Sequence, residues 1–253
     1  MSSFKIPTVK HTEFNPNNLT IKPPKINTKG LGATLVARYN HNNNEETKFR
    51  TQTPKMIQAF ELNADKRDDN SMAYSINVSF RGDEEGTKLD NFRKMLEEMD
   101  EHNINYATEN SETIFGKKKS REVIEENYTR MVKYSKKEGY RPTLKLKMPI
   151  YDDKPGFTVF NKDKDPIPTL IEEDDTIDLS MFTGGSEAVH LIEFTGLWQT
   201  NNKFGGTWKV IQTKIYSSAG QMAGCMIEDD SDDETDVETS VETDIADEDE
   251  DEF

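Results

Sequence analysis

The chain is poor in cysteine and in long apolar runs, and its C-terminal end has no positive charge. Its 253 residues include a single cysteine, Cys225, which excludes a disulfide framework and any paired-cysteine metal site. No apolar run approaches the roughly 18 residues that a membrane span needs, and residues 1–10 lack the apolar stretch of a secretory signal. These absences favour an intracellular protein in a reducing compartment, with no membrane partner.

Catalytic signatures are also missing from the sequence. The four histidines show no metal-ligand spacing among themselves or with the cysteine. The glycine pairs at Gly184 and Gly205 indicate turns, because neither is followed by the Gly-Lys-Ser/Thr of a phosphate-binding loop. We therefore expect a binding protein rather than an enzyme, with no cofactor and no metal.

Charge divides the chain into two parts. Residues 228–253 contain 16 acidic residues and no Lys or Arg, so this segment accounts for the formal net charge of −16. The rest of the chain is balanced, with 32 acids against 32 Lys and Arg. A segment with this composition and without apolar periodicity is expected to be disordered.

Composition predicts three parts along the chain. Residues 1–30 are rich in Pro, Asn, Thr and Lys and are expected to form an extended N-terminal arm, with a short edge strand at Leu19–Ile21. Residues 31–224 are expected to form the core. Residues 225–253 are the disordered acidic tail, which ends in Phe253.

Periodicity predicts a mainly β fold with one or two helical insertions. Alternating apolar residues predict strands at 31–40, 47–60 with a bend at Pro54, 72–80, 143–151, 157–161, 176–179, 188–198 and 207–216, with a hairpin loop at 201–206. Helical spacing after a capping box at Thr87 and Asp90 predicts one helix, and a second is expected over residues 121–136. Because strands and helices do not alternate regularly, this order favours a small antiparallel barrel or sandwich.

Basic and aromatic residues lie close together on several of these strands. The candidate binding residues are Arg50, Lys55, Tyr140, Arg141, Lys145, Lys147, Lys209, Lys214 and Tyr216. Cations that follow a phosphate backbone and rings that stack on bases are typical of proteins that bind single-stranded nucleic acid. The alternative is that the aromatics form the core and the lysines a solvated face, and Trp208, Tyr74 and Phe80 are assigned to the core.

The end of the tail combines charge with one aromatic ring. Its last residues are Asp249, Glu250, Asp251, Glu252 and Phe253. An acidic peptide with an apolar end is suited to a basic groove that contains a pocket for one ring. We expect these five residues to contact a partner.

A strand-rich body with basic strands, an inserted helix and an acidic tail closing on Phe253 resembles the replication single-stranded-DNA-binding proteins of short-tailed coliphages. Residues 51–56 and 205–211 resemble the relatives of these proteins that large nucleocytoplasmic DNA viruses encode. The resemblance implies an OB fold that acts in viral DNA replication, recombination or repair, in the host cytoplasm (the viral factory) or nucleus. It also implies a tail that competes with DNA and recruits a replicative DNA polymerase, primase or helicase.

Two other functions remain open from the sequence. One is an acidic-tailed chaperone for basic proteins, such as a histone-binding or virion-assembly factor, in which the tail is itself the binding element. The other is a structural virion protein with a β-sandwich. The sequence also leaves open a homodimer and the choice between DNA and RNA.

Overall fold

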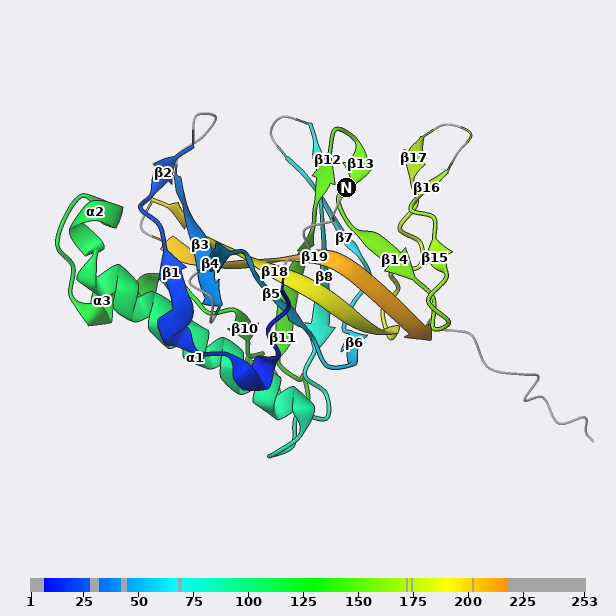
Figure 1. The fold of residues 1–253 in the computed structure, drawn as a ribbon, viewed down its shortest axis with the longest axis horizontal. Coiled ribbons are helices and arrows are strands. Elements are labelled where there is room, and N and C mark those ends of the chain that lie inside the picture. Colours follow the sequence, from blue (N-terminus) through cyan, green and yellow to red (C-terminus); the bar gives the residue numbers. More distant parts are fainter. Residues whose placement is uncertain are drawn as a thin grey trace, which may run out of the picture. The chain divides into compact units, whose positions relative to one another are not determined.

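The computed structural model describes residues 7–27, 32–41, 45–67, 70–171, 173, 175–201 and 203–217 (Figure 1). These residues belong to one compact unit, residues 1–220. The acidic tail and its five predicted partner-binding residues lie outside the described residues. None of the helices in the described part of the chain is long and apolar enough to cross a membrane.

Helices form one contiguous part of the described chain. They are α1 (Lys88–Glu109), α2 (Ser111–Phe115) and α3 (Arg121–Asn127), and short 3₁₀ turns cover His11–Glu13 and Pro16–Asn18. The strands before them are β1 (Leu19–Ile21), β2 (Lys25–Ile26), β3 (Ala33–His41), β4 (Glu45–Thr47), β5 (Phe49–Gln52), β6 (Met56–Gln58), β7 (Asn63–Lys66) and β8 (Met72–Ser79). The strands after them are β9 (Tyr128–Thr129), β10 (Val132–Lys133), β11 (Thr143–Met148), β12 (Ile150–Tyr151), β13 (Lys154–Pro155), β14 (Thr158–Phe160), β15 (Pro166–Ile167), β16 (Leu170–Ile171), β17 (Thr176–Ile177), β18 (Glu187–Thr200) and β19 (Lys203–Ser217).

Five strands pair in a ring. β18 pairs with β6, β6 with β8, β8 with β11, β11 with β19, and β19 again with β18. All of these pairs are antiparallel except β11–β19, and this order with one parallel pair is that of an OB-type barrel. The ring is not a clearly closed barrel, because its β18–β6, β6–β8 and β11–β19 junctions have only two residue pairs each. The prediction of a mainly β fold with helical insertions is confirmed.

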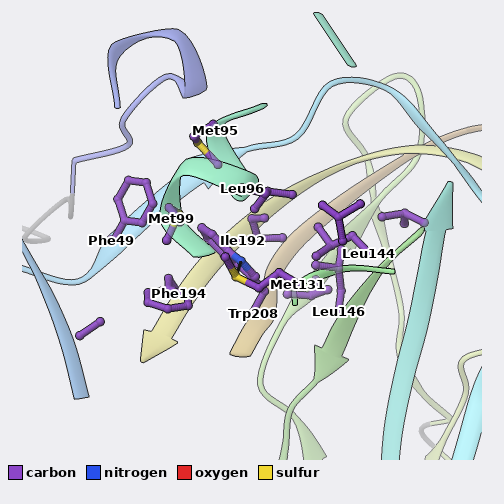
Figure 2. Close-up of a cluster of buried hydrophobic side chains, with 14 of the residues drawn as sticks. Phe49, Met95, Leu96, Met99, Met131, Leu144, Leu146, Ile192, Phe194 and Trp208 are labelled. Carbon is purple, nitrogen blue, oxygen red and sulfur yellow. Dashed lines mark hydrogen bonds between the residues drawn. The ribbon is translucent and has the colours of Figure 1, made fainter. Parts of the chain in front are cut away.

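Helix α1 supplies much of the core. Its side chains Met95, Leu96 and Met99 belong to the same buried cluster as Trp208 of β19 and Phe194 of β18, and all five are almost fully buried (Figure 2). The predicted cap is present, since the Asp90 N–H donates to the Thr87 hydroxyl over 3.2 Å. The Asp90 carboxylate in turn accepts the N–H of Gly86, so the start of the helix is held from both sides.

The second predicted helix is wrong beyond Asn127. The chain leaves the helix there and forms β9 and β10, which pair with β19 and β11. The Tyr128 ring packs against Phe204 at 5.0 Å, and its hydroxyl donates to the buried Asp100. These tertiary contacts outweigh a weak helical pattern, because differences in helix propensity amount to only roughly 0–0.7 kcal/mol per ordinary residue.

Two smaller predictions also need correction. Ile76 and Val78 of β8, and Phe80 just after it, face the core as predicted. Met72 is exposed and Tyr74 only partly buried, because the start of this strand extends past the core. The hairpin between β18 and β19 is shorter than the predicted loop, since pairing continues to Thr200 and Lys203. The predicted strand Leu19–Ile21 is confirmed as β1, which pairs with β3.

Candidate nucleic-acid interface

A lateral row of polar residues crosses the outer face of the ring. Strand register places Arg50 of β5 beside Glu193 of β18, and Glu193 beside Lys209 of β19. Lys209 in turn lies beside Lys147 of β11, and Lys147 beside Ser75 of β8. Residues far apart in the sequence thus form one continuous band on a single face of the sheet.

Glu193 anchors the centre of this band. Its carboxylate is only 3 % exposed and contacts Arg50 Nε at 2.8 Å, Lys209 Nζ at 3.1 Å and Lys48 Nζ at 3.3 Å. Burial alone would raise the pKa of the Glu193 carboxyl, but the hydrogen bond from Arg50 and the charges of Lys209 and Lys48 hold it below its usual range. The ionised carboxylate therefore fixes the positions of these cations.

Strand β11 presents two lysines to solvent beside this anchor. Lys145 and Lys147 are exposed, whereas Leu144, Leu146 and Met148 point into the core, as their alternation predicts. Lys145 has only a long contact of 3.9 Å with the exposed Asp65, and Lys147 forms no ion pair with any residue that the structure describes. The band therefore carries positive charge that the described residues leave uncompensated.

The electrostatics at Lys147 reflect this excess of positive charge. Desolvation by neighbouring side chains lowers the pKa of the Lys147 ammonium, and repulsion from Arg67 and Lys145 lowers it further. An anion placed among these three cations would relieve the repulsion. Such a site favours the approach of a phosphate.

The two lysines line an open hollow of about 570 Å³, which we call the central groove. Its other walls include Arg67, Tyr74, Tyr151 and Lys209, and one carboxylate, that of Asp65. The Tyr151 ring is 56 % exposed, and its hydroxyl lies 3.5 Å from Lys209 Nζ. Ser75 lies at the same hollow with a buried hydroxyl that has no hydrogen-bond partner among the described residues.

A smaller hollow adjoins the central groove, and we call it the Trp198 slot. It shares Lys145 and Lys147 with the groove and is also lined by Trp198, Lys133 and Arg130. β11 and β19 pair directly at only two positions. Beyond these positions β10 pairs with β11 and β9 pairs with β19, so the β9–β10 segment fills the space between the two strands. The partly exposed indole of Trp198 thus lies next to a rim of cations.

Glycine is required beneath this indole. Gly205 pairs with Trp198 across the hairpin. A Cβ at Gly205 would lie 2.8 Å from the carbonyl oxygen of Thr129 and 3.2 Å from the Trp198 ring. The absence of a side chain lets β9 approach β19 closely and shapes the slot.

The predicted binding residues separate into three groups. Arg50, Lys147 and Lys209 belong to the outer band, and Lys145 lies on the same face of β11. Lys55, Lys214 and Tyr216 lie together toward the end of β19, where Tyr216 receives both ammonium groups over its ring, at 5.9 Å and 4.9 Å. Tyr140 and Arg141 lie in the loop between β10 and β11 and line neither the groove nor the slot.

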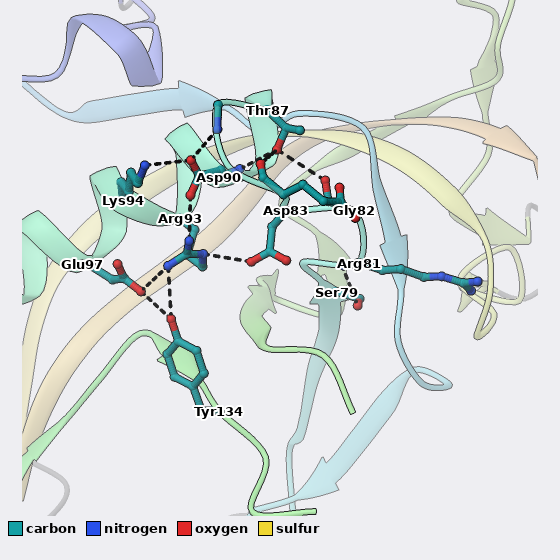
Figure 3. Close-up of polar contacts among 12 residues, drawn as sticks. Ser79, Arg81, Gly82, Asp83, Thr87, Asp90, Arg93, Lys94, Glu97 and Tyr134 are labelled. Atoms are coloured by element: carbon teal, nitrogen blue, oxygen red, sulfur yellow. Dashed lines mark hydrogen bonds and ion pairs between the residues drawn. The ribbon is translucent and has the colours of Figure 1, made fainter. Parts of the chain in front are cut away.

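That loop is tethered at its start to α1. Arg93 reaches the carboxylates of Asp83 at 2.9 Å and Asp90 at 2.7 Å, and it also bonds Glu97 (Figure 3). Arg93 and Glu97 together hold the hydroxyl of Tyr134. The network fixes the place where the chain leaves β10, six residues before Tyr140.

Several residues of the interface were not predicted from the sequence. They include Arg67, Lys133, Tyr151 and Trp198. Trp198 had a usable signal, because a tryptophan at a hairpin end has few core neighbours. Arg67 and Tyr151 had none. Arg67 follows β7 and Tyr151 lies in β12, and they come together because β7 pairs with β8 and β8 with β11, the strand just before β12.

The described residues thus form a β-rich body with helical insertions and a basic, aromatic-walled groove on one face. Residues 83–224, more than half of the chain, match the model of a family of unknown function (DUF5871), and the chain belongs to that family. No curated protein sequence matches it. Among solved structures, the crystal structure of gp2.5, a single-stranded DNA binding protein encoded by bacteriophage T7, matches with a TM-score of 0.42 and 10 % identity, over 70 % of this chain and 91 % of that one.

Proposed function

We propose that this protein binds single-stranded nucleic acid along the outer face of β8, β11 and β19. The observation that carries the proposal is the cluster of three cations, Arg67, Lys145 and Lys147, between two aromatic walls, Tyr151 and Trp198. Among the described residues this cluster has one long ion-pair contact, between Lys145 and Asp65 at 3.9 Å. Cations attract and track a phosphate backbone, and base–ring stacking contributes about 1–3 kcal/mol per base. The chain is a binding protein in this proposal and has no catalytic step of its own.

The same surface is the basis on which we expect binding without sequence preference. Its contacts are ammonium, guanidinium and ring faces, which every nucleotide satisfies equally. A row of amide side chains aimed at base edges, which would read sequence, is not found among the residues that line the described groove. We therefore expect similar affinities for strands of different sequence.

The finer role follows from the resemblance of the sequence to phage-type replication proteins. In this proposal the protein covers single strands during viral DNA replication or recombination. Residues 228–253 compete with the strand for the basic face, and residues 249–253 engage a polymerase, primase or helicase. The chemistry of the tail supports this, since it offers 16 carboxylates and a terminal aromatic ring.

The test is fluorescence anisotropy with labelled oligo-dT and with a duplex of equal length. The proposal predicts saturable binding of the single strand, weaker binding of the duplex, and strong dependence on salt. A protein that binds a basic protein such as a histone but no oligonucleotide would instead be an acidic chaperone. That result would overturn the proposal.

A further inference from the structure

We infer that the path of the strand continues from the central groove along β19 to a second basic hollow beside the N-terminal arm. This inference rests on the proposed function and adds the route, and hence the length of strand that the protein covers. The second hollow, called here the arm hollow, measures about 660 Å³. It is lined by Lys10, His11, Thr53, Lys55, Lys88 and their neighbours.

The first step of the argument is a bulge in β19. Lys209 and Lys214 are five residues apart, so in a regular strand they would point to opposite faces. Their partners in β18 are Glu193 and Val189, which are four residues apart and share a face. Ile211 is the extra residue, and this bulge places Lys214 on the same outer face as Lys209.

The second step is continuity of the surface beyond the bulge. A further hollow on this face is lined by Gln52, Val189, Leu191 and Lys214. Gln52 and Val189 also line the arm hollow, so the two hollows share a wall. The outer face therefore continues, about 20 Å past Lys209 along the strand, to the arm hollow.

The third step is charge. Among the described residues no Asp or Glu lines either of these hollows. Lys88 and Lys214 form no ion pair with a described carboxylate, and the Lys214 ammonium lies over the ring of Tyr216. Lys10 and Lys55, which also line the arm hollow, pair with Glu13 and Glu187. Burial lowers the pKa of His11, and the nearby charge of Lys88 lowers it further.

Carboxylates gather in a different hollow, which adjoins the Trp198 slot through Arg130. This hollow lies on α1 and is lined by Glu97, Glu98, Asp100 and Glu101, with Arg130 as its cation. A polyanionic strand is repelled there and attracted along β19. Charge complementarity thus selects one continuous route, with a stacking ring at each end, Tyr151 in the groove and Tyr216 beside the arm hollow.

The test compares two lengths of oligo-dT, one of about 5 and one of about 15 nucleotides, within the site sizes known for single OB folds. The variant is Lys88→Gln with Lys214→Gln. The matched control is Lys25→Gln with Lys118→Gln, which removes the same charge from exposed residues that line none of these hollows.

The inference predicts an effect that depends on length. For the long strand, the slope of log K against log salt becomes shallower by about 1.4, at about 0.7 per lost phosphate contact. For the short strand, which fits the central groove alone, the slope stays that of the wild type. The control leaves both slopes unchanged.

Equal slopes for variant and wild type with the long strand would overturn the inference, as would an equal change with both lengths. The proposed function is judged separately, by whether the wild type binds the short strand at all. If the long-strand slope does not change in the variant while the wild type still binds the short strand, the central groove alone is the binding site.

Discussion

Trp198 and Trp208 show how two identical side chains ten residues apart in one hairpin acquire different tasks. Trp208 is 1 % exposed, and its indole N–H donates to Met131 Sδ at 3.0 Å. Trp198 lies at the slot beside Lys133 and Lys145. The sequence predicted that Trp208 lies in the core. That Trp198 is available to a base is evident only from the path of β9.

Replacing Trp198 by alanine should weaken binding of oligo-dT by roughly 5- to 150-fold, which corresponds to the loss of about 1–3 kcal/mol of stacking. Since Trp208 is buried, quenching of tryptophan fluorescence on binding should be lost in the same variant. Trp198→Phe keeps a ring and should retain most of the affinity. Wild-type affinity for Trp198→Ala would remove the slot from the site.

A second residue-scale prediction concerns His190, which is 2 % exposed and bonds Thr213 through Nδ1 at 2.9 Å. Burial lowers the pKa of this imidazole to about 4. Because the unfolded state binds the proton more readily, the free energy of unfolding should fall as pH drops from about 6.5 to about 4, by at most about 3 kcal/mol.

The measurement is urea unfolding of the wild type and of His190→Gln at several pH values. The variant should be less stable near neutrality and should lose less stability between pH 7 and pH 4 than the wild type. Parallel pH profiles for the two proteins would show that this histidine does not titrate in that range.

At the scale of elements, prediction succeeded where the pattern was local and failed where it depended on distant contacts. The alternation of Lys145 and Lys147 with Leu144 and Leu146 was sufficient to orient β11, because a strand's side chains alternate whatever it pairs with. Residues 128–133 have no such pattern of their own. Their conformation is set by pairing with β11 and β19, which lie beyond the range of any local pattern.

The N-terminal cap of α1 leads to a prediction about the stability of the protein. Thr87→Ala removes the acceptor of the Asp90 N–H and should lower the free energy of unfolding by about 1 kcal/mol. Thr113→Ala in α2 is the control, since that threonine is exposed and should change stability by less than about 0.5 kcal/mol. Equal stability of the two variants in urea would contradict the capping role.

At the scale of the whole molecule, residues 1–227 have no net charge, but their positive and negative side chains gather on different parts of the surface. Cations predominate on the β11 and β19 face, where the described carboxylates include Glu193 and Asp65, and carboxylates predominate in the hollow on α1. The sequence showed basic and acidic stretches, but the ring of five strands decides which of them share a face. The pairing of β11 with β19, which joins Lys147 to Lys209, connects strands about 60 residues apart and is invisible to periodicity.

Removing residues 228–253 takes the formal charge from −16 to 0. If this segment competes for the basic face, the shortened protein should bind oligo-dT more tightly than the full chain. The gain should be largest at low salt, because screening weakens the competition as salt rises. Equal or weaker binding by the shortened protein, measured by anisotropy, would exclude competition and favour the chaperone alternative.

The most direct test of the central claim is the salt dependence of oligo-dT binding by Lys145→Ala with Lys147→Ala. Both side chains point to solvent, so the free energy of unfolding should change by less than about 0.5 kcal/mol each. If the two ammonium groups contact phosphates, the slope of log K against log salt becomes shallower by up to about 1.4, while Lys25→Ala with Lys118→Ala leaves it unchanged. A slope and affinity equal to those of the wild type would contradict the assignment of this face as the nucleic-acid interface.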